Sequence, residues 1–213
     1  TNGSYTGNPC PDAPGQGGIP NAEIEADFDW HYSGTLASYR RFENGTQKDW
    51  ADYYHDPLDR LYRETEYHPG AGPAVTTSFL YRGASDLVRS EAGLEQKSYA
   101  YTLEDSLLAL DTVPAGGGPT QSHAYTANVH TDISLLLSVD AGASQVQASY
   151  GYLAYGNADT QLTQGDFSQN PYRFNAKRFD SASGTLDMGA RRFSTLVGRF
   201  FEVDGDEDPQ LHD

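Results

Sequence analysis

The sequence predicts an all-β protein in which repeated β-hairpins build a curved, spiralling sheet. Its 213 residues include 22 glycines, 11 prolines and 15 tyrosines against a single methionine. Glycine and proline mark turns, whereas tyrosine suits the half-buried surface of a strand. An aromatic residue followed by an aliphatic one also recurs along the chain, with turn-forming residues between the two. Together these observations favour many short strands, arranged in one large domain or two small ones.

The first segment, residues 1–22, is rich in glycine, proline and asparagine and has almost no apolar periodicity. This composition predicts a flexible arm or linker. The segment contains Cys10, the sole cysteine, which has no partner for an internal disulfide and no histidine nearby in the sequence. We therefore expect an unpaired cysteine in the arm rather than a catalytic thiol.

Hairpin repeats are predicted over residues 23–122, and their spacing continues a little further. The aromatic residues recur every 20 to 27 positions, and the aliphatic residue follows 6 to 8 positions later. The pairs are Trp30 with Leu36, Tyr54 with Leu61, Tyr81 with Leu87, Tyr101 with Leu107, and Tyr125 with Ile133. This order is that of a hairpin, and its repetition predicts a sheet in which no unit buries its apolar face alone. Longer loops are expected at 107–120 and 158–171.

The best-formed unit is YYHDPLDRLYRETEY, residues 53–67. It resembles the tyrosine-aspartate (YD) repeat, whose pattern is roughly Y-x-D-x-x-G-R-L-x-x-x-T. The matching residues are Tyr54, Asp56, Arg60, Leu61 and Thr65. Asp59 stands where the pattern has glycine, which predicts a left-handed turn position, since aspartate enters that region more easily than most residues.

Residues 170–205, NPYRFNAKRFDSASGTLDMGARRFSTLVGRFFEVDG, place many arginines beside aromatic residues in a chain of net charge −16. This stretch resembles the core that closes RHS-repeat proteins, in which NPYRF, a glycine-containing turn, an arginine-containing strand and GRF follow in this order. Upstream, ASYGYLAYGN at 148–157 resembles the segment that precedes that core. The residues that carry the likeness are Asn170, Pro171, Tyr172, Arg173, Phe174, Gly184, Arg191 and Gly198.

The resemblance holds in order and spacing over about 125–205 and is only repeat-like over 27–110. It implies a hollow β-shell wound from YD repeats, with the core plugging one end. The domain division expected from it is an arm at 1–22, YD-like hairpins at 23–122, an RHS-associated core at 123–205 and an acidic tail at 206–213.

The arginines of the core are predicted to serve packing and ion pairing rather than catalysis. A guanidinium group stacks on an aromatic ring and forks onto carboxylates, so arginine can join neighbouring strands where a purely apolar interior would not fit. We expect this role for Arg173, Arg178, Arg191 and Arg192.

The family resemblance also implies one enzymatic hypothesis. Many RHS cores are aspartyl autoproteases in which GRF and a following aspartate supply an arginine and one of two carboxylates. Gly198-Arg199-Phe200 and Asp204 match that first half, which makes Arg199 and Asp204 the candidate catalytic residues. However, Gly205 replaces the usual proline, and no second motif follows, although two carboxylates are needed for acid–base work. We therefore expect no complete protease site here, and an alternative role for Arg199 as a structural clamp on a carboxylate or carbonyls.

Charge and motif content exclude several function classes. With 30 acidic against 14 basic residues, the chain would repel nucleic acid and anionic membranes over most of its surface. No apolar run approaches the ~18 residues of a membrane helix. The spacing of Asp204, Asp206 and Asp208 resembles the start of a calcium loop, but Pro209 stands where that loop requires glycine. We predict no metal and no cofactor, because His123 and His130 alone do not form a zinc site and no phosphate-binding loop occurs.

Our leading hypothesis is a structural module of a secreted or surface-exposed RHS-like shell that encloses or presents a C-terminal polypeptide such as a toxin. Its partners would be that cargo and other shell chains. Two alternatives remain open. One is the aspartyl autoprotease that releases the C-terminal segment, and the other is an adhesion or self-assembly module that binds glycans through exposed tyrosines.

Overall fold

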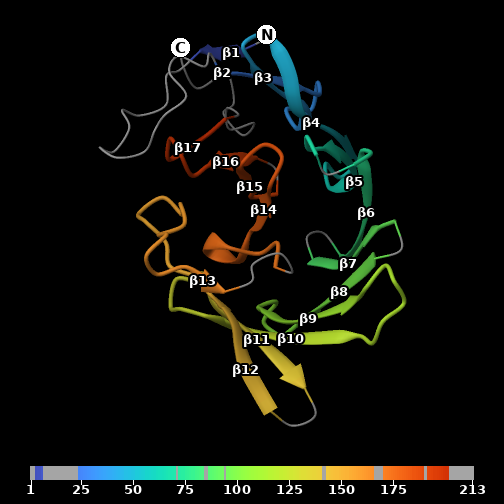
Figure 1. The fold of residues 1–213 in the computed structure, drawn as a ribbon, viewed down its shortest axis with the longest axis vertical. Helices are drawn as coiled ribbons and strands as arrows, with labels where there is room; N and C mark the ends of the chain where they lie inside the picture. The colour runs from blue at the N-terminus through green and yellow to red at the C-terminus, as the bar shows by residue number, and fades with distance from the viewer. Residues whose placement is uncertain are drawn as a thin grey trace, which may run out of the picture.

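A computed structural model describes residues 3–6, 24–70, 72–83, 86–93, 95–140, 143–165, 170–189 and 191–201. Within these residues the chain forms two antiparallel sheets and a single 3-10 turn, η1 (Phe174–Ala176). The larger sheet has 13 strands in chain order, and the smaller has four. The predicted all-β fold of repeated hairpins in a curved sheet is confirmed (Figure 1).

The strands of the larger sheet are β1 (Gly3–Thr6), β2 (Ile24–Trp30), β3 (Leu36–Glu43), β4 (Thr46–His55), β5 (Leu61–Tyr67), β6 (Val75–Arg82), β7 (Asp86–Ala92), β8 (Glu95–Tyr101), β9 (Leu107–Val113), β10 (Gln121–Ala127), β11 (Ile133–Asp140), β12 (Ala143–Ser149) and β13 (Gln164–Gly165). The smaller sheet consists of β14 (Arg178–Asp180), β15 (Thr185–Asp187), β16 (Arg192–Ser194) and β17 (Arg199–Phe200). Residues 3–6 of the expected arm thus form β1, which pairs with β2. The sheet also continues from β9 to β10, across residues 122 and 123.

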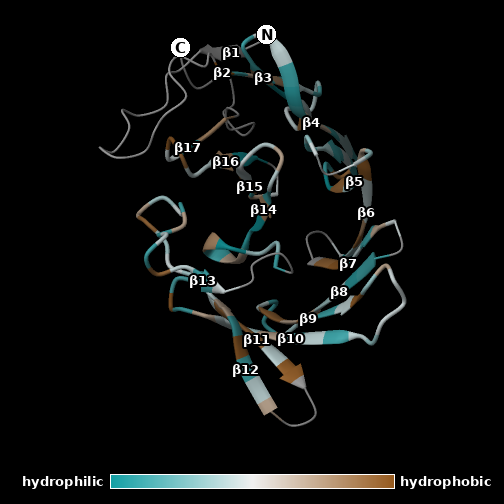
Figure 2. Cartoon of the chain, in the orientation of Figure 1, coloured by the Kyte–Doolittle hydropathy of each residue, from teal (hydrophilic) through white to brown (hydrophobic). Residues whose placement is uncertain are grey.

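The larger sheet bends around the C-terminal residues. In Figure 1 its strands follow a curve from β1 at the top to β12 at the bottom, and β14–β17 lie inside that curve. Figure 2 shows that hydrophobic and hydrophilic residues both occur along the curved sheet, as expected when a strand presents one face to a core and the other to solvent. No helix in the described part of the chain is long and apolar enough to cross a bilayer.

The hairpins share one spacing that is more regular than the sequence suggested. In five alternate hairpins of the sheet, a residue at or next to the end of one strand pairs with the residue six positions later, beside an irregularity in register. These pairs are Trp30 with Leu36, His55 with Leu61, Tyr81 with Leu87, Tyr101 with Leu107, and Ala127 with Ile133. All five aliphatic positions were predicted correctly, but Tyr54 and Tyr125 were wrong as their partners. The aromatic signal failed there because this position is filled by histidine and alanine.

The turns between these strands also repeat. The amide of Asp56 donates to the carbonyl of Arg60 at 2.9 Å, and the amide of Asp59 donates to the carbonyl of Asp56 at 2.9 Å. The turns that start at His31, Thr102, Asn128 and Leu153 have the same pair of hydrogen bonds. Their fourth residue has a positive φ in every case, +57° at Asp59 and +89° at Gly34. The predicted left-handed turn at Asp59 is therefore confirmed.

The core lies on the concave face of the larger sheet, in two clusters. One contains Leu36, Tyr39, Tyr53 and Leu61 with Ala182 of the C-terminal unit. The other is larger and includes the residues Leu87, Tyr99, Leu110, Tyr125, Ile133, Leu136, Ala148, Tyr150 and Tyr172. Both clusters thus join repeat residues to the segment after residue 170. The loop expected at 107–120 is wrong in its first half, because Leu107–Val113 is β9.

Candidate functional site on the concave face

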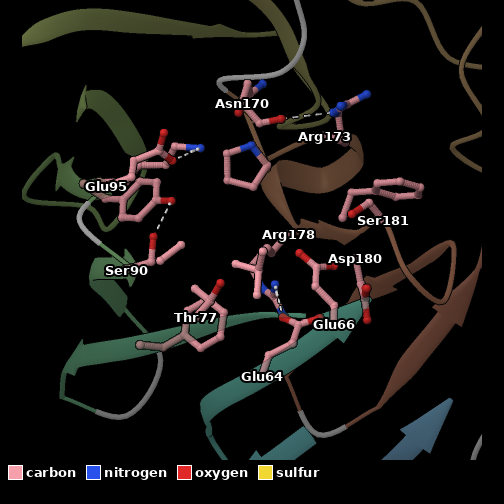
Figure 3. A pocket seen from close by; sticks show the side chains of 17 residues that line it. Glu64, Glu66, Thr77, Ser90, Glu95, Asn170, Arg173, Arg178, Asp180 and Ser181 are labelled. Carbon is pink, nitrogen blue, oxygen red and sulfur yellow. Dashed lines mark hydrogen bonds and ion pairs between the residues drawn. The ribbon is translucent and has the colours of Figure 1, made fainter. Parts of the chain in front are cut away.

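A cavity of about 410 Å³ lies between the concave face of β5–β8 and the start of the C-terminal unit (Figure 3). Its walls combine carboxylates, cations and aromatic rings. The lining residues are Glu64, Glu66, Val75, Thr77, Phe79, Ser90, Ala92, Glu95, Lys97, Tyr99, Asn170, Pro171, Arg173, Arg178, Phe179, Asp180 and Ser181. The site therefore contains residues from both sheets, brought together by the curvature.

The repeat register explains which side chains face this cavity. Directly paired residues share a face of an antiparallel sheet, and one row across β4–β8 consists of Tyr53, Glu64, Thr77, Ala92 and Glu95. A second row, two residues away, contains Phe79, Ser90, Lys97 and Thr112. Because strand residues alternate between faces, these rows both point toward the C-terminal unit.

A buried ion pair and a buried hydrogen bond attach the C-terminal unit to the sheet, and a second ion pair lies within the unit. Arg178 Nη1 donates to Glu64 Oε2 at 3.1 Å, although the two residues are 114 positions apart in sequence. Arg192 Nη1 donates to Asp180 Oδ2 at 3.1 Å, and the Tyr53 hydroxyl donates to the same carboxylate oxygen at 2.5 Å. The side chains of Asp180 and Arg192 are 0% and 4% exposed, so these contacts are shielded from water.

The guanidinium groups also cover aromatic rings. The Arg178 Cζ atom lies 4.7 Å from the ring centroid of Phe79, and the Arg192 Cζ atom lies 4.8 Å from that of Tyr53. Arg191 lies over Phe200 at 3.9 Å, and Arg173 lies over both Tyr150 and Phe179 at 5.3 and 5.6 Å. The prediction of packing on aromatic rings is confirmed for these four arginines, and the prediction of ion pairing is confirmed for Arg178 and Arg192.

The cluster contains more carboxylates than cations. Among the described residues, the guanidinium groups paired with Glu64, Asp180 and Asp187 are those of Arg178 and Arg192, and Arg178 Nη2 is 3.6 Å from Asp187 Oδ2. Burial, together with the nearby Asp180 carboxylate, raises the pKa of Glu64 to about 8. Burial alone would also raise the pKa of Asp180, but Arg192 and Arg178 outweigh it and hold that pKa below its ordinary value. The pKa of Asp187 is lowered in the same way.

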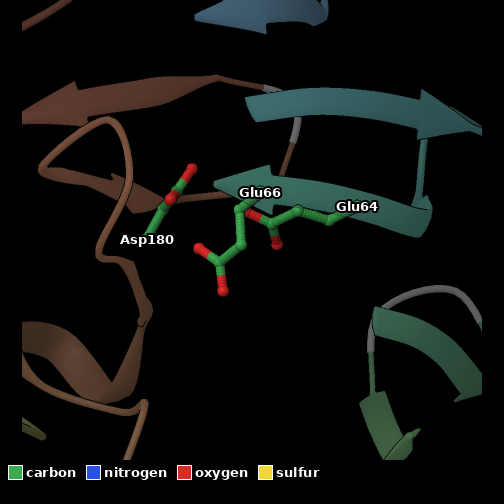
Figure 4. A group of neighbouring side chains, drawn as sticks. All are labelled: Glu64, Glu66 and Asp180. Carbon is green, nitrogen blue, oxygen red and sulfur yellow. The ribbon is translucent and has the colours of Figure 1, made fainter. Parts of the chain in front are cut away.

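Glu66 brings a third carboxylate to the pair formed by Glu64 and Asp180, and one oxygen of each lies within 4.8 Å of the others (Figure 4). This spacing alone does not make a metal site. Glu64 and Asp180 are already paired with guanidinium groups, and Glu66 lies 3.3 Å from His68 Nε2. We therefore assign no metal to these residues.

The predicted YD residues occupy one turn and its connection to the next hairpin. Asp56 Oδ1 accepts the amides of Leu58 and Arg60 at 2.9 and 3.1 Å, and Arg60 Nε donates to Asp56 Oδ2 at 2.8 Å. Arg60 lies 5.4 Å from the Tyr81 ring centroid and donates to the Gly83 carbonyl. Leu61 is buried, and its carbonyl accepts the Tyr81 hydroxyl at 2.9 Å. Tyr54 is half-buried and packs against Arg63 instead, at 4.0 Å.

The NPYRF segment forms a compact turn against the sheet. The buried Asn170 side chain donates to the Tyr172 carbonyl at 2.6 Å and accepts the Tyr172 amide at 2.8 Å. The Pro171 carbonyl accepts the Phe179 amide at 2.7 Å. Tyr172 meets Tyr99 edge to face at 5.3 Å, and Phe174 meets Tyr152 at 5.9 Å. The segment thus fixes the start of the C-terminal unit on the larger core cluster.

Two glycines of the same unit occupy turn positions. Gly184 has a φ of +68°, and its amide donates to the Asp180 carbonyl at 2.9 Å. Gly198 has a φ of +66°, and a Cβ atom there would lie 2.9 Å from Tyr155 Cγ. The backbone at Gly198 is therefore close-packed, because both its conformation and the available space exclude a side chain.

Of the two candidate catalytic residues, only Arg199 lies within the described residues. Arg199 is exposed in β17 and makes no side-chain hydrogen bond or ion pair within the described residues. The clamp hypothesis for Arg199 is therefore wrong. Its neighbour Phe200 turns inward and contacts Phe193 at 5.3 Å, so Arg199 points to the opposite face of the strand. Asp204 lies outside the described residues, as do Asp206 and Asp208.

Sequence reasoning missed Tyr53, Glu64, Asp180 and Asp187. Tyr53 lies two residues after the buried Ala51 in β4, so a two-residue period would have placed it on the core face. Glu64 could not have been found in this way, because Tyr62, two residues earlier in β5, is exposed. A carboxylate on a core face predicts a buried cation partner, and the arginine-rich segment offered several. Nothing in the sequence, however, indicated which arginine would meet which carboxylate.

Comparisons with known proteins support the fold. No protein-family model matches the sequence, and neither does any curated protein. Among solved structures, "Crystal Structure of TcdB2-TccC3-TEV" matches with a TM-score of 0.64 and 16% identity, over 84% of this chain and 9% of that chain. "Structure of Photorhabdus luminescens Tc holotoxin pore" matches with a TM-score of 0.63 and 15% identity, over 85% of this chain and 9% of that chain.

A third structure, "Crystal Structure of TcdB2-TccC3 without hypervariable C-terminal region", matches with a TM-score of 0.55 and 11% identity, over 86% of this chain and 12% of that chain. The protein therefore has an RHS-like all-β fold, similar to a part of Tc toxin chains. It spans about a tenth of the length of these chains.

Proposed function

We propose that this chain is a wall segment of an RHS-like shell in a toxin complex, and that the shell encloses or presents a C-terminal polypeptide. The observation that carries the proposal is the curved sheet with its C-terminal unit on the concave face. A surface that faces inward is suited to contain a polypeptide, and the structural likeness to Tc toxin chains supports this context.

The proposal includes the partners and location expected from the sequence. The described sheet ends at β1 and β13, and strand edges are natural sites for continuation by further strands. Other shell chains or repeats would supply them. We also propose a secreted or cell-surface location, and a division into YD-like hairpins at 23–122 and an RHS-associated core at 123–205.

Protease protection tests enclosure in a longer protein that includes this chain and the polypeptide after it. We expect that polypeptide to resist a protease in the native protein and to be digested after mild denaturation. Leu110→Asp, which places a charge at a fully buried position of β9, should abolish the protection. Leu108→Asp in the same strand is the matched control, because Leu108 is 50% exposed. Equal digestion in the native wild type and in Leu110→Asp would refute enclosure.

A second candidate function is autoproteolysis with Arg199 and Asp204. One observation favours it, namely that Arg199 is exposed and uses none of its donors on other described residues. Mass spectrometry of the longer protein, wild type against Asp204→Asn, distinguishes the two functions. Cleavage in the wild type alone supports the protease, whereas equal intact masses exclude it. Glycan binding through exposed tyrosines is a weaker proposal, for which a glycan array is the test.

A further inference from the structure

We propose that the folded protein holds one proton between the carboxyl groups of Glu64 and Asp180, and that this proton controls how firmly the C-terminal unit is attached to the concave face. Three buried or nearly buried carboxylates face two guanidinium groups, so full ionisation would leave one negative charge uncompensated away from water. An unpaired buried charge is costly, and binding a proton removes it.

This pair lies between the two sheets. Within the described residues the sheets share no strand pairing, so side chains make the contact between them at this place. Glu64 belongs to β5 of the larger sheet, and Asp180 belongs to β14 of the smaller one. Repulsion between two ionised carboxylates whose oxygens lie within 4.8 Å would therefore act across the joint between the sheets.

Other ionisable groups surround the cluster. They include Tyr53 and His55 of β4, Glu66 of β5, Tyr81 of β6, Arg178 of β14, Asp187 of β15 and Arg192 of β16. Burial lowers the pKa of His55 to about 4 and raises the pKa of both tyrosines, so these three groups stay neutral between pH 5 and 9. Both arginines stay charged, and Glu66 is half-buried beside His68.

The sign of the pH effect follows from these environments. In the unfolded chain a glutamate releases its proton near 4.5, whereas in the folded protein Glu64 keeps it up to a pKa of about 8. Between these values the folded state binds the extra proton, so stability falls as the pH rises. Asp180 and Asp187 have lowered pKa values, so their contribution is lost only in more acidic solution. The attachment should therefore be firmest in mildly acidic solution.

Glu64→Gln is the direct test, because glutamine has the shape of protonated glutamate and carries no charge. Urea unfolding of wild type and variant would be compared from pH 5 to pH 9. We expect the wild-type unfolding constant to rise relative to that of the variant, by up to about tenfold per pH unit until Glu64 is ionised. Glu95→Gln is the control, since Glu95 lines the same cavity but is partly exposed beside Lys97. It should follow the wild-type profile.

Two further measurements locate the effect. Carbon NMR of the wild-type carboxyl groups should show one signal, absent in Glu64→Gln, that titrates far above the ordinary range of glutamate. Hydrogen exchange, corrected for its intrinsic pH dependence, should show earlier loss of protection in β14–β16 than in β10 and β11 at alkaline pH. The proposal is overturned if wild type and Glu64→Gln share one pH profile, if Glu64→Gln fails to fold at pH 5, or if the Glu64 signal titrates near 4.5.

Discussion

Replacing Tyr53 by phenylalanine removes a single oxygen atom from the buried contact between the two sheets. The ring of Tyr53 is 1% exposed, and its hydroxyl donates to Asp180 at 2.5 Å. Phenylalanine fills the same space, so the change removes the hydrogen bond without creating a large cavity. Arg192 would still lie over the ring, and the effect on stability should come from Asp180.

The size of the effect can be worked out from the remaining donors. A hydrogen bond to a charged group contributes about 1.5–3 kcal/mol. Asp180 would keep the side chain of Arg192 at 3.1 Å, the Ser183 hydroxyl at 2.9 Å and the Ala182 amide at 3.0 Å. We therefore expect the lower end, about 1.5–2 kcal/mol, which corresponds to a fall in Tm of about 3–8 °C for a domain of this size.

Thermal and urea unfolding of the wild type and Tyr53→Phe would measure this loss. Tyr54→Phe is the matched control, because Tyr54 lies on the other face of β4 and its hydroxyl makes no hydrogen bond within the described residues. The control should change stability by less than about 0.5 kcal/mol. An equal loss in both variants, or none in Tyr53→Phe, would refute the assigned role of the Asp180 contact.

Three other substitutions test the remaining assignments, each by urea unfolding. Gly198→Ala should cost about 1–3 kcal/mol, because φ is +66° and Tyr155 leaves no space for a side chain. Gly45→Ala, where φ is +71° and the space is open, should cost less. Equal costs would contradict the role of the tyrosine. Arg199→Lys should leave stability within about 0.5 kcal/mol, since the side chain is exposed, and a larger loss would restore the clamp hypothesis. Asp59→Val should cost about 1–2 kcal/mol, because valine is strained at this left-handed position, whereas Asp59→Gly should be tolerated. Equal costs of the two substitutions would contradict the assigned turn conformation.

Local patterns predicted the hairpins because each hairpin is a local structure. Leu36 and Ile133 were identified from their spacing after an aromatic residue, and both are fully or almost fully buried. The prediction at Asp59 succeeded for the same reason, since a turn conformation depends on a few neighbouring residues. Tyr54 was misjudged because consecutive strand residues face opposite sides, and an error of one position exchanges a core residue for a half-buried one.

The long-range contacts could not be predicted in the same way. Arg178 was expected to meet a carboxylate, but its partner Glu64 lies 114 residues earlier in the chain. The choice among many acidic residues depends on the curvature of the sheet, which accumulates over successive strands. The aspartate of the autoprotease motif, Asp204, lies outside the described residues, so the catalytic pair stays a prediction.

Two kinds of contact join the two sheets, and they differ in how strictly they fix the register of one sheet against the other. Apolar packing around Ala182 and Tyr172 draws the C-terminal unit to the concave face, but apolar surfaces tolerate sliding along a strand. The Glu64–Arg178 ion pair and the Tyr53–Asp180 hydrogen bond do not, because a shift of one residue would move a buried charged group away from its partner. Buried ion pairs add little net stability once the loss of hydration is counted. Their value at this joint lies in fixing the register, and the excess carboxylate makes that register sensitive to a single proton.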